Sequence, residues 1–195
     1  ADLVTANNVF AHVPNVLRLT ENIKKIMKDD GVFVIEVQYL LDIIKNLTFD
    51  NIYHEHVFYY TVNSLVELFK RLDMTVFKVE HVDSHGGSLR VFVQKNTGKR
   101  LKDASVNEFL QNEIALGLNK SETYEAFGEK LKKIKEEVIM FIEKTKKEGK
   151  RIVGYGAPAK ATTFLNFCGI GKESVEYIIE DNSLKQGLFI PGVNI

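Results

Sequence analysis

The sequence has 195 residues, of which 45% are hydrophobic and 27% are charged, as in an ordinary globular protein. Its 26 basic and 26 acidic side chains cancel, which excludes a broad basic surface that binds nucleic acid or anionic membrane through charge alone. No stretch reaches the roughly 18 apolar residues of a membrane span, and the first residues do not resemble a secretion signal. A single cysteine, Cys168, excludes internal disulfides and multi-cysteine zinc sites. We therefore expect a cytoplasmic protein.

The beginning of the sequence predicts a strand, a helix and a second strand. Residues 2–6 are typical of a short buried strand, and apolar residues then recur at helical spacing between positions 16 and 26. After the Asp-Asp-Gly stop that follows, residues 32–37 form a continuous apolar run. Such runs suit a strand that is covered on both faces of a parallel sheet. The order of these segments predicts a βαβ unit.

A helix, a hairpin and a long helical region are expected next. Residues 63–72 predict a helix with Asn63 as its cap. The β-type segments 75–82 and 88–94 are joined by a short loop with two adjacent glycines, which predicts an antiparallel hairpin. Residues 101–147 are expected to be helical, because apolar residues recur every three or four positions among lysines and glutamates.

The last part of the sequence predicts a second α/β unit. Residues 151–156 are typical of a strand that runs into a glycine turn, a helix opens at Ala157, and residues 175–179 predict another strand. The sequence stops at Ile195, soon after this strand, so we expect the second unit to be incomplete.

The densest group of reactive side chains is Tyr53-His54-Glu55-His56. Between a strand and a helix, this group offers a general base with hydrogen-bonding neighbours. If the segment is extended, Tyr53 and Glu55 share one face while His54 and His56 share the other. Two alternatives stay open: a surface turn whose histidines have no function, and a zinc or iron site at His54 and His56, although the four-residue spacing of His-Glu-x-x-His is absent.

Asn8 and His12 lie four residues apart where the first strand gives way to a helix. Both can point into the crevice at the carboxyl end of that strand, where open parallel sheets bind ligands. The spacing alone favours a structural role, in which Asn8 caps the helix and His12 packs against it.

Two glycine-containing segments are further candidates. The turn from Gly154 to Lys160 precedes a helix and can bind an anion such as phosphate, or can simply allow close strand–helix packing. In the hairpin, turn geometry alone explains the two glycines, which leaves His85, Ser88 and Arg90 as open ligand candidates. We interpret Cys168 as a small core residue rather than a nucleophile.

Four motifs occur along the chain in the order Ala6-Asn7-Asn8-Val9-Phe10-Ala11-His12, Ile52-Tyr53-His54-Glu55-His56, His85-Gly86-Gly87-Ser88-Leu89-Arg90 and Gly154-Tyr155-Gly156-Ala157-Pro158-Ala159-Lys160-Ala161. In this order they resemble the sugar C-methyltransferases of nucleotide-linked deoxysugar pathways, over nearly the whole chain. Members of that family carry an amino-terminal zinc module, a central S-adenosylmethionine-dependent methyltransferase domain and a carboxyl-terminal Rossmann-like domain. They methylate a sugar carbon beside a ketone, typically C3 of a TDP-4-keto-6-deoxysugar.

The resemblance implies an α/β fold: the second half of a class I, Rossmann-like methyltransferase sheet that ends in an antiparallel hairpin, then a helical connection and a partial Rossmann-like domain. Residues 1–97 would be the carboxyl-terminal part of the catalytic domain, 98–149 the helical region and 150–195 the start of the last domain. The family's zinc-binding cysteines, first sheet strands and glycine-rich cofactor loop are absent from this sequence, so we interpret it as a fragment.

The resemblance also assigns roles to individual residues. His56 would be the catalytic base, with Tyr53, Glu55 and His54 polarising or shaping the site. Ala6 and Asn7 would adjoin S-adenosylmethionine, and no metal is expected in this chain, since zinc belongs to the absent module. The expected substrate is a nucleotide-linked keto-sugar, with neither nucleic acid nor membrane as a partner and with the oligomeric state open. Residues implied in substrate binding are Asn8, His12, His85, Arg90, Gly154, Gly156, Ala157 and Lys160.

This chemistry is physically reasonable. A C–H group beside a ketone is a feeble acid, and a histidine near its usual pKa of ~6.5 is a weak base for it. Enolate formation therefore needs a donor that stabilises the developing oxyanion, for which Tyr53 or His54 is suitable. The alternatives are a non-catalytic nucleotide-sugar binding module that uses the glycine turn and Lys160, and a metal-dependent hydrolase built on His54 and His56.

Overall fold

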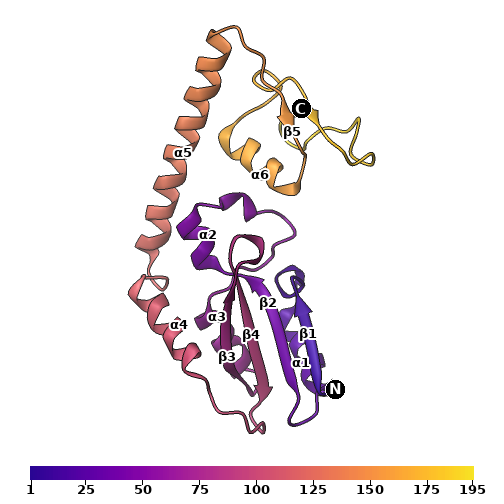
Figure 1. Ribbon diagram of the computed structural model, residues 1–195, viewed down its shortest axis with the longest axis vertical. Helices are drawn as coiled ribbons and strands as arrows, with labels where there is room; N and C mark the ends of the chain where they lie inside the picture. The colour runs from indigo at the N-terminus through magenta and orange to yellow at the C-terminus, as the bar shows by residue number, and fades with distance from the viewer. The chain divides into compact units, whose positions relative to one another are not determined.

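The computed structural model describes residues 1–195, which divide into two compact units (Figure 1). Unit 1 comprises residues 1–48 and 54–124, and unit 2 comprises residues 49–53 and 125–195. None of the helices combines the length and the apolar character that crossing a membrane requires.

Unit 1 is built on a four-stranded mixed sheet. Its strands lie in the order β1-β2-β4-β3, where β1 and β2 are parallel and β4 is antiparallel to both of its neighbours. This arrangement confirms the α/β class, the initial strand–helix–strand unit and the terminal hairpin. The strands are β1 (Leu3–Asn7), β2 (Val32–Gln38), β3 (Met74–Val82) and β4 (Ser88–Lys95).

Helix α1 (Val16–Ile26) connects β1 and β2. The side chain of Asn15 caps it by accepting a hydrogen bond from a first-turn backbone amide at 3.0 Å. The capping role considered for Asn8 is therefore wrong, because Asn8 lies earlier, in the turn before the short helix η1 (Phe10–His12). The buried residues of α1 are Val16, Thr20 and Ile23, whereas Leu17 and Ile26, which belong to the predicted apolar spacing, are exposed.

Helix α3 (Val62–Lys70) leads into the hairpin. It begins with a capping box, in which the side chains of Thr61 and Ser64 each bond to the other's backbone amide. The prediction of Asn63 as the cap is wrong, because Asn63 is already inside the first turn. A further short helix, α2 (Leu40–Asn46), follows β2 and was not predicted.

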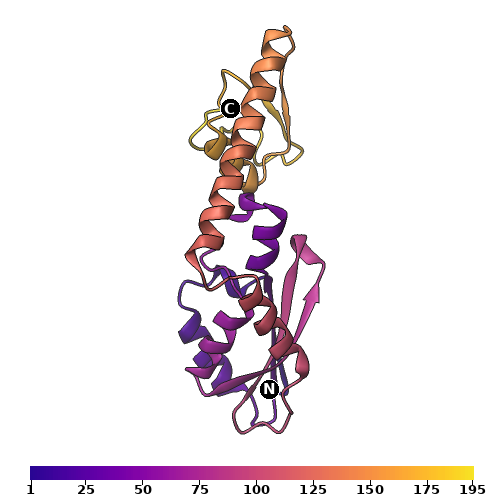
Figure 2. The same cartoon turned by 90° about the vertical axis from the view of Figure 1, so that its left-hand side faces the viewer.

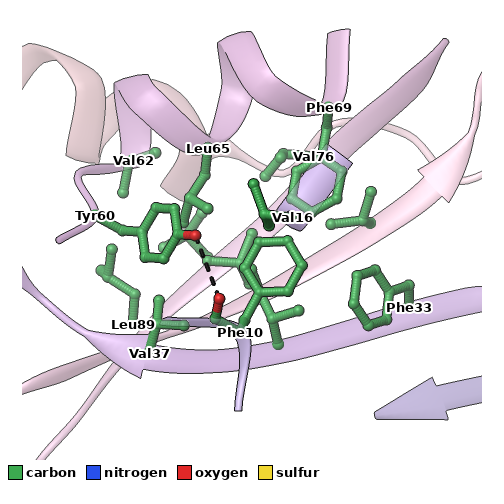
Figure 3. Packing of buried hydrophobic residues seen from close by; sticks show 14 of the residues in the cluster. Phe10, Val16, Phe33, Val37, Tyr60, Val62, Leu65, Phe69, Val76 and Leu89 are labelled. Carbon is green, nitrogen blue, oxygen red and sulfur yellow. Dashed lines mark hydrogen bonds between the residues drawn. The ribbon is translucent and has the colours of Figure 1, made fainter. Parts of the chain in front are cut away.

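The core of unit 1 lies between the sheet and its helices (Figure 3). Phe10 is fully buried at its centre, and its ring lies 6.0 Å from that of Phe33, 5.7 Å from that of Tyr60 and 6.1 Å from that of Phe69. The Tyr60 hydroxyl donates to the Phe10 carbonyl at 3.4 Å. Burial raises the pKa of Tyr60 well above its usual range, so this hydroxyl stays protonated. The core thereby anchors the short helix that follows β1.

The helical region after the hairpin is confirmed but is not continuous. It contains α4 (Ala104–Ala115) and α5 (Ser121–Lys147). Gly117 separates them with a φ of 69°, a left-handed conformation that favours glycine.

Unit 2 contains most of α5 together with β5 (Gly154–Tyr155), α6 (Ala159–Cys168) and β6 (Ile178–Ile179). Strands β5 and β6 pair in parallel, so the expected second α/β unit is present, although each strand is shorter than predicted. In both views α5 lies beside the lobe that holds α6 (Figures 1 and 2). Cys168 is 1% exposed in the small core of this unit, which confirms its predicted packing role.

Gly87 is required by two independent constraints. Its φ is 117°, and a Cβ placed on it would lie 2.2 Å from Oδ2 of Asp42, the oxygen that contacts Nε2 of His81 at 2.8 Å. We expect Gly87→Ala to lower the free energy of unfolding by about 2–4 kcal/mol through strain and overlap together. Gly86→Ala is the control, because Gly86 has a φ of 85° but open space around it, and should cost about 1 kcal/mol. Urea denaturation of the two variants checks this prediction, which equal losses would contradict.

Candidate functional site

The carboxyl ends of the two parallel strands form the candidate site of unit 1. Asn7, the last residue of β1, lies opposite Glu36 of β2 in the strand register. Open α/β sheets bind ligands at this edge. The side chain of Asn7 is exposed there, and that of Ala6 is half-buried.

Asn8 turns the chain away from β1. Its φ is 54°, and its amide donates to the backbone carbonyl of Glu36 at 2.9 Å. The turn leads into η1, which ends at the half-buried His12. The buried Phe10 fixes this short helix, so His12 is held close to the carboxyl end of the strand.

His56 lies against His12. Their ring centroids are 5.0 Å apart with the planes inclined at 62°, and the Tyr59 ring lies 6.1 Å from His56 at 85°. The amides of Val57 and Phe58 both donate to the Ala11 carbonyl, at 3.0 and 3.3 Å. The segment after His56 is thus tied to the residue before His12, and the structure brings these two predicted site residues together.

The rest of the Tyr53–His56 motif is arranged differently from the sequence expectation. Residues 53–55 form a bend and a turn just before His56, so the alternating faces expected of an extended segment are wrong. The His54 side chain is 81% exposed, and its Nε2 lies 3.9 Å from Oε1 of Glu55, which is also exposed. Tyr53 belongs to unit 2, where its amide donates to the Asn51 carbonyl at 3.2 Å.

A buried carboxylate joins the hairpin to the same end of the sheet. Glu36 accepts the hydroxyl of Ser84 at 2.8 Å and two guanidinium N–H groups of Arg90 at 3.2 and 2.8 Å. These hydrogen bonds, from Arg90 first and Ser84 second, hold the pKa of Glu36 below its usual value. His85 follows Ser84 at the hairpin tip, with an exposed side chain and a φ of 53°.

The glycine turn of unit 2 is partly filled by an internal anion. Gly156 has a φ of 83°, and the next amide, of Ala157, donates to Oε2 of Glu180 at 2.7 Å. Backbone hydrogen bonds from Asn182 and Ala157 lower the pKa of Glu180. The Ala157 carbonyl accepts from Lys185 at 2.8 Å. An external anion at this turn would therefore compete with Glu180 for at least one amide. Lys160, which is half-buried, does not hydrogen-bond to Glu180.

A zinc or iron site at His54 and His56 would need further donor side chains close to them. No group of three or more His, Cys, Asp or Glu residues is placed to hold a metal ion.

Comparison with known proteins places the chain in a family. Residues 83–195 match the model of the C-methyltransferase C-terminal domain, and residues 1–79 match that of a methyltransferase domain. The chain belongs to the C-methyltransferase family. Over 195 residues it is 32% identical to the C-methyltransferase NovU of Streptomyces niveus, an alignment that covers 100% of this chain and 46% of NovU. The chain therefore spans less than half the length of this relative.

The family assignment confirms the resemblance and the Rossmann-like methyltransferase fold. The two family models meet between residues 79 and 83, at the tip end of the β3–β4 hairpin. The structural division of this chain lies elsewhere: β4 and α4 pack in unit 1, which continues to residue 124. Part of the segment matched as the carboxyl-terminal domain thus completes the methyltransferase sheet.

Glu36 was not among the site residues predicted from the sequence. The residue lies within the apolar run of β2, which was interpreted only as a buried strand. The one charged side chain in that run was an available signal, because carboxylates are almost never fully buried unless they are paired.

Proposed function

We propose that this C-methyltransferase transfers a methyl group from S-adenosylmethionine to the carbon beside the ketone of a nucleotide-linked deoxysugar. The observation that carries the proposal is the contact of His56 with His12 at the carboxyl ends of β1 and β2. The name of NovU supports C-methylation. The sugar class rests on the four motifs that resemble deoxysugar C-methyltransferases.

His56 is proposed as the base. A ring nitrogen takes the proton from the carbon beside the ketone, and the C–H electron pair moves to the ketone oxygen, which leaves an enolate and an imidazolium. Tyr53 or His54 donates a hydrogen bond to the enolate oxygen, and Glu55 polarises the motif. The edge-to-face contact with His12 keeps the His56 ring from rotating away from the substrate.

S-adenosylmethionine, when bound, supplies a methyl group that is activated by its sulfonium charge. Ala6 and Asn7 would adjoin this group, because they end the parallel strand β1. Asn8, His12 and His85 are proposed to contact the sugar or its diphosphate. Gly154, Gly156, Ala157 and Lys160 are proposed to contact the nucleotide side.

The division of the chain into a catalytic part at 1–97, a helical region at 98–149 and the start of a Rossmann-like domain at 150–195 is proposed together with this function. Under this organisation, the proposed base and the glycine turn belong to different domains.

The proposed substrate class can be tested directly with the full-length protein that the gene encodes. With radiolabelled methyl donor, we expect transfer to TDP-4-keto-6-deoxyglucose and none to the matched sugar whose ketone is reduced to a hydroxyl. Only the ketone lets the adjacent carbon lose a proton as an enolate. Scintillation counting and mass spectrometry of the sugar check the result. Equal transfer to both sugars would exclude the enolate route, and binding of the keto-sugar without transfer would favour the binding-module alternative.

A further inference from the structure

Glu36 contacts two parts of the candidate site that are far apart in the sequence, the turn after β1 and the β3–β4 hairpin. Its backbone carbonyl accepts the amide of Asn8 at 2.9 Å. Its Oε1 accepts the Ser84 hydroxyl at 2.8 Å, and its Oε2 accepts Nε and Nη2 of Arg90 at 3.2 and 2.8 Å. Glu36 is only 6% exposed. Both carboxylate oxygens are therefore used to connect β2 to the hairpin.

Arg90 is balanced by carboxylates on both sides. It lies opposite Glu36 on β2 and opposite Glu80 on β3, and its Nη1 is 3.8 Å from Oε2 of Glu80. A guanidinium between two carboxylates presents little net positive charge to an approaching diphosphate. Its planar fork instead fixes the Glu36 carboxylate in one orientation. Arg90 thus acts through Glu36.

Ser84 connects the fixed carboxylate of Glu36 to the hairpin tip. Its carbonyl accepts the Gly87 amide and the Ser88 hydroxyl, both at 3.0 Å, which closes the tip on itself. Its own hydroxyl ties the closed tip to Glu36. His85, the next residue, is therefore held at the edge of the sheet where Asn8 also lies.

We propose that Glu36 is a positioning residue for substrate binding, because its carboxylate holds the tip that carries His85 beside Asn8, which its backbone carbonyl holds, so that both residues reach one ligand. The inference rests on the proposed function, since it takes the nucleotide-linked keto-sugar as that ligand. Glu36 does not touch the substrate, so its loss acts on KM more than on kcat.

Steady-state kinetics of methyl transfer to TDP-4-keto-6-deoxyglucose, measured with the full-length protein that the gene encodes, test the proposal. We expect Glu36→Gln to raise KM by about tenfold or more and to change kcat by less than about threefold, because the charge-assisted hydrogen bonds of the carboxylate hold the tip that carries His85. The backbone hydrogen bond to Asn8 is retained in this variant. Ser84→Ala, which keeps the Glu36–Arg90 pair, should raise KM about threefold. Glu80→Gln is the matched control: it removes the other carboxylate beside Arg90 without touching Ser84 or Asn8, and should leave KM within about twofold.

The outcomes separate positioning from charge and from folding. Equal rises in KM for Glu36→Gln and Glu80→Gln, or a fall in kcat at constant KM, would overturn the proposal. If circular dichroism shows that Glu36→Gln does not fold, the KM of Ser84→Ala is compared with that of Glu80→Gln instead. An unchanged KM in Ser84→Ala would then reject the positioning role of Glu36. If the wild type binds the sugar nucleotide but does not methylate it, the proposed function fails and calorimetric Kd values for the same variants test Glu36. A wild type that neither binds nor methylates it overturns both.

Discussion

Replacement of His56 by alanine is expected to lower methyl transfer by about 10²–10⁴-fold, the usual contribution of a positioned acid–base group. Alanine removes the ring nitrogen that accepts the proton, whereas the hydrogen bonds from Val57 and Phe58 to Ala11 are made by the backbone and are retained. The same variant should lose exchange of the proton beside the ketone. That exchange is measured by NMR with the keto-sugar in D₂O without the methyl donor.

His81→Gln is the matched control for this experiment. His81 is also a histidine of unit 1 with a partly exposed side chain, and its Nε2 lies 2.8 Å from Asp42, away from the His12–His56 contact. A glutamine can still donate to Asp42, so we expect transfer within about twofold of wild type. Full transfer and exchange in His56→Ala would remove His56 from the mechanism. Comparable losses in both variants would mean that the assay reports the fold rather than the base.

The parts of the fold that depend on local pattern could be predicted from the sequence. Helix α1 and the β3–β4 hairpin follow from side-chain periodicity and from a two-glycine loop, both of which act over neighbouring residues. Helix α2 was missed because its seven residues are too few for a periodic signal. The sequence also lacks the glycine that usually marks the end of a helix, because Leu47 adopts the left-handed φ of 55° that terminates α2.

The candidate site was only partly predictable for a different reason. The motifs singled out His12 and His56, but their contact depends on backbone hydrogen bonds between Ala11 and residues 57–58, which no sequence spacing specifies. Glu36 was missed because its role arises from tertiary pairing with Ser84 and Arg90. Residue types therefore identified candidate chemistry, and the packing of separate segments determined which side chains meet.

Glu113→Ala is expected to cause the largest loss of stability, about 3–5 kcal/mol. Glu113 lies on α4, is 3% exposed, and accepts the amides of Val62 and Asn63 at 2.5 and 2.9 Å in the first turn of α3. It also accepts the hydroxyl of Tyr39 at 3.0 Å. Burial, reinforced by the charge of Glu113, raises the pKa of Tyr39 far above its usual range, so Tyr39 keeps the proton that it donates. Alanine leaves three donors without their acceptor and enlarges a cavity of about 210 Å³ beside them.

Glu108→Ala provides the control on the same helix, because Glu108 is exposed and its loss should change stability by no more than about 0.5 kcal/mol. Urea denaturation measures the global difference, and hydrogen exchange by mass spectrometry locates it. Because Glu113 caps α3, peptides that cover Val62–Lys70 should lose protection in Glu113→Ala before peptides from β2 do. Similar unfolding midpoints for the two variants, or unchanged protection in α3, would show that the backbone amides of its first turn are satisfied without this carboxylate.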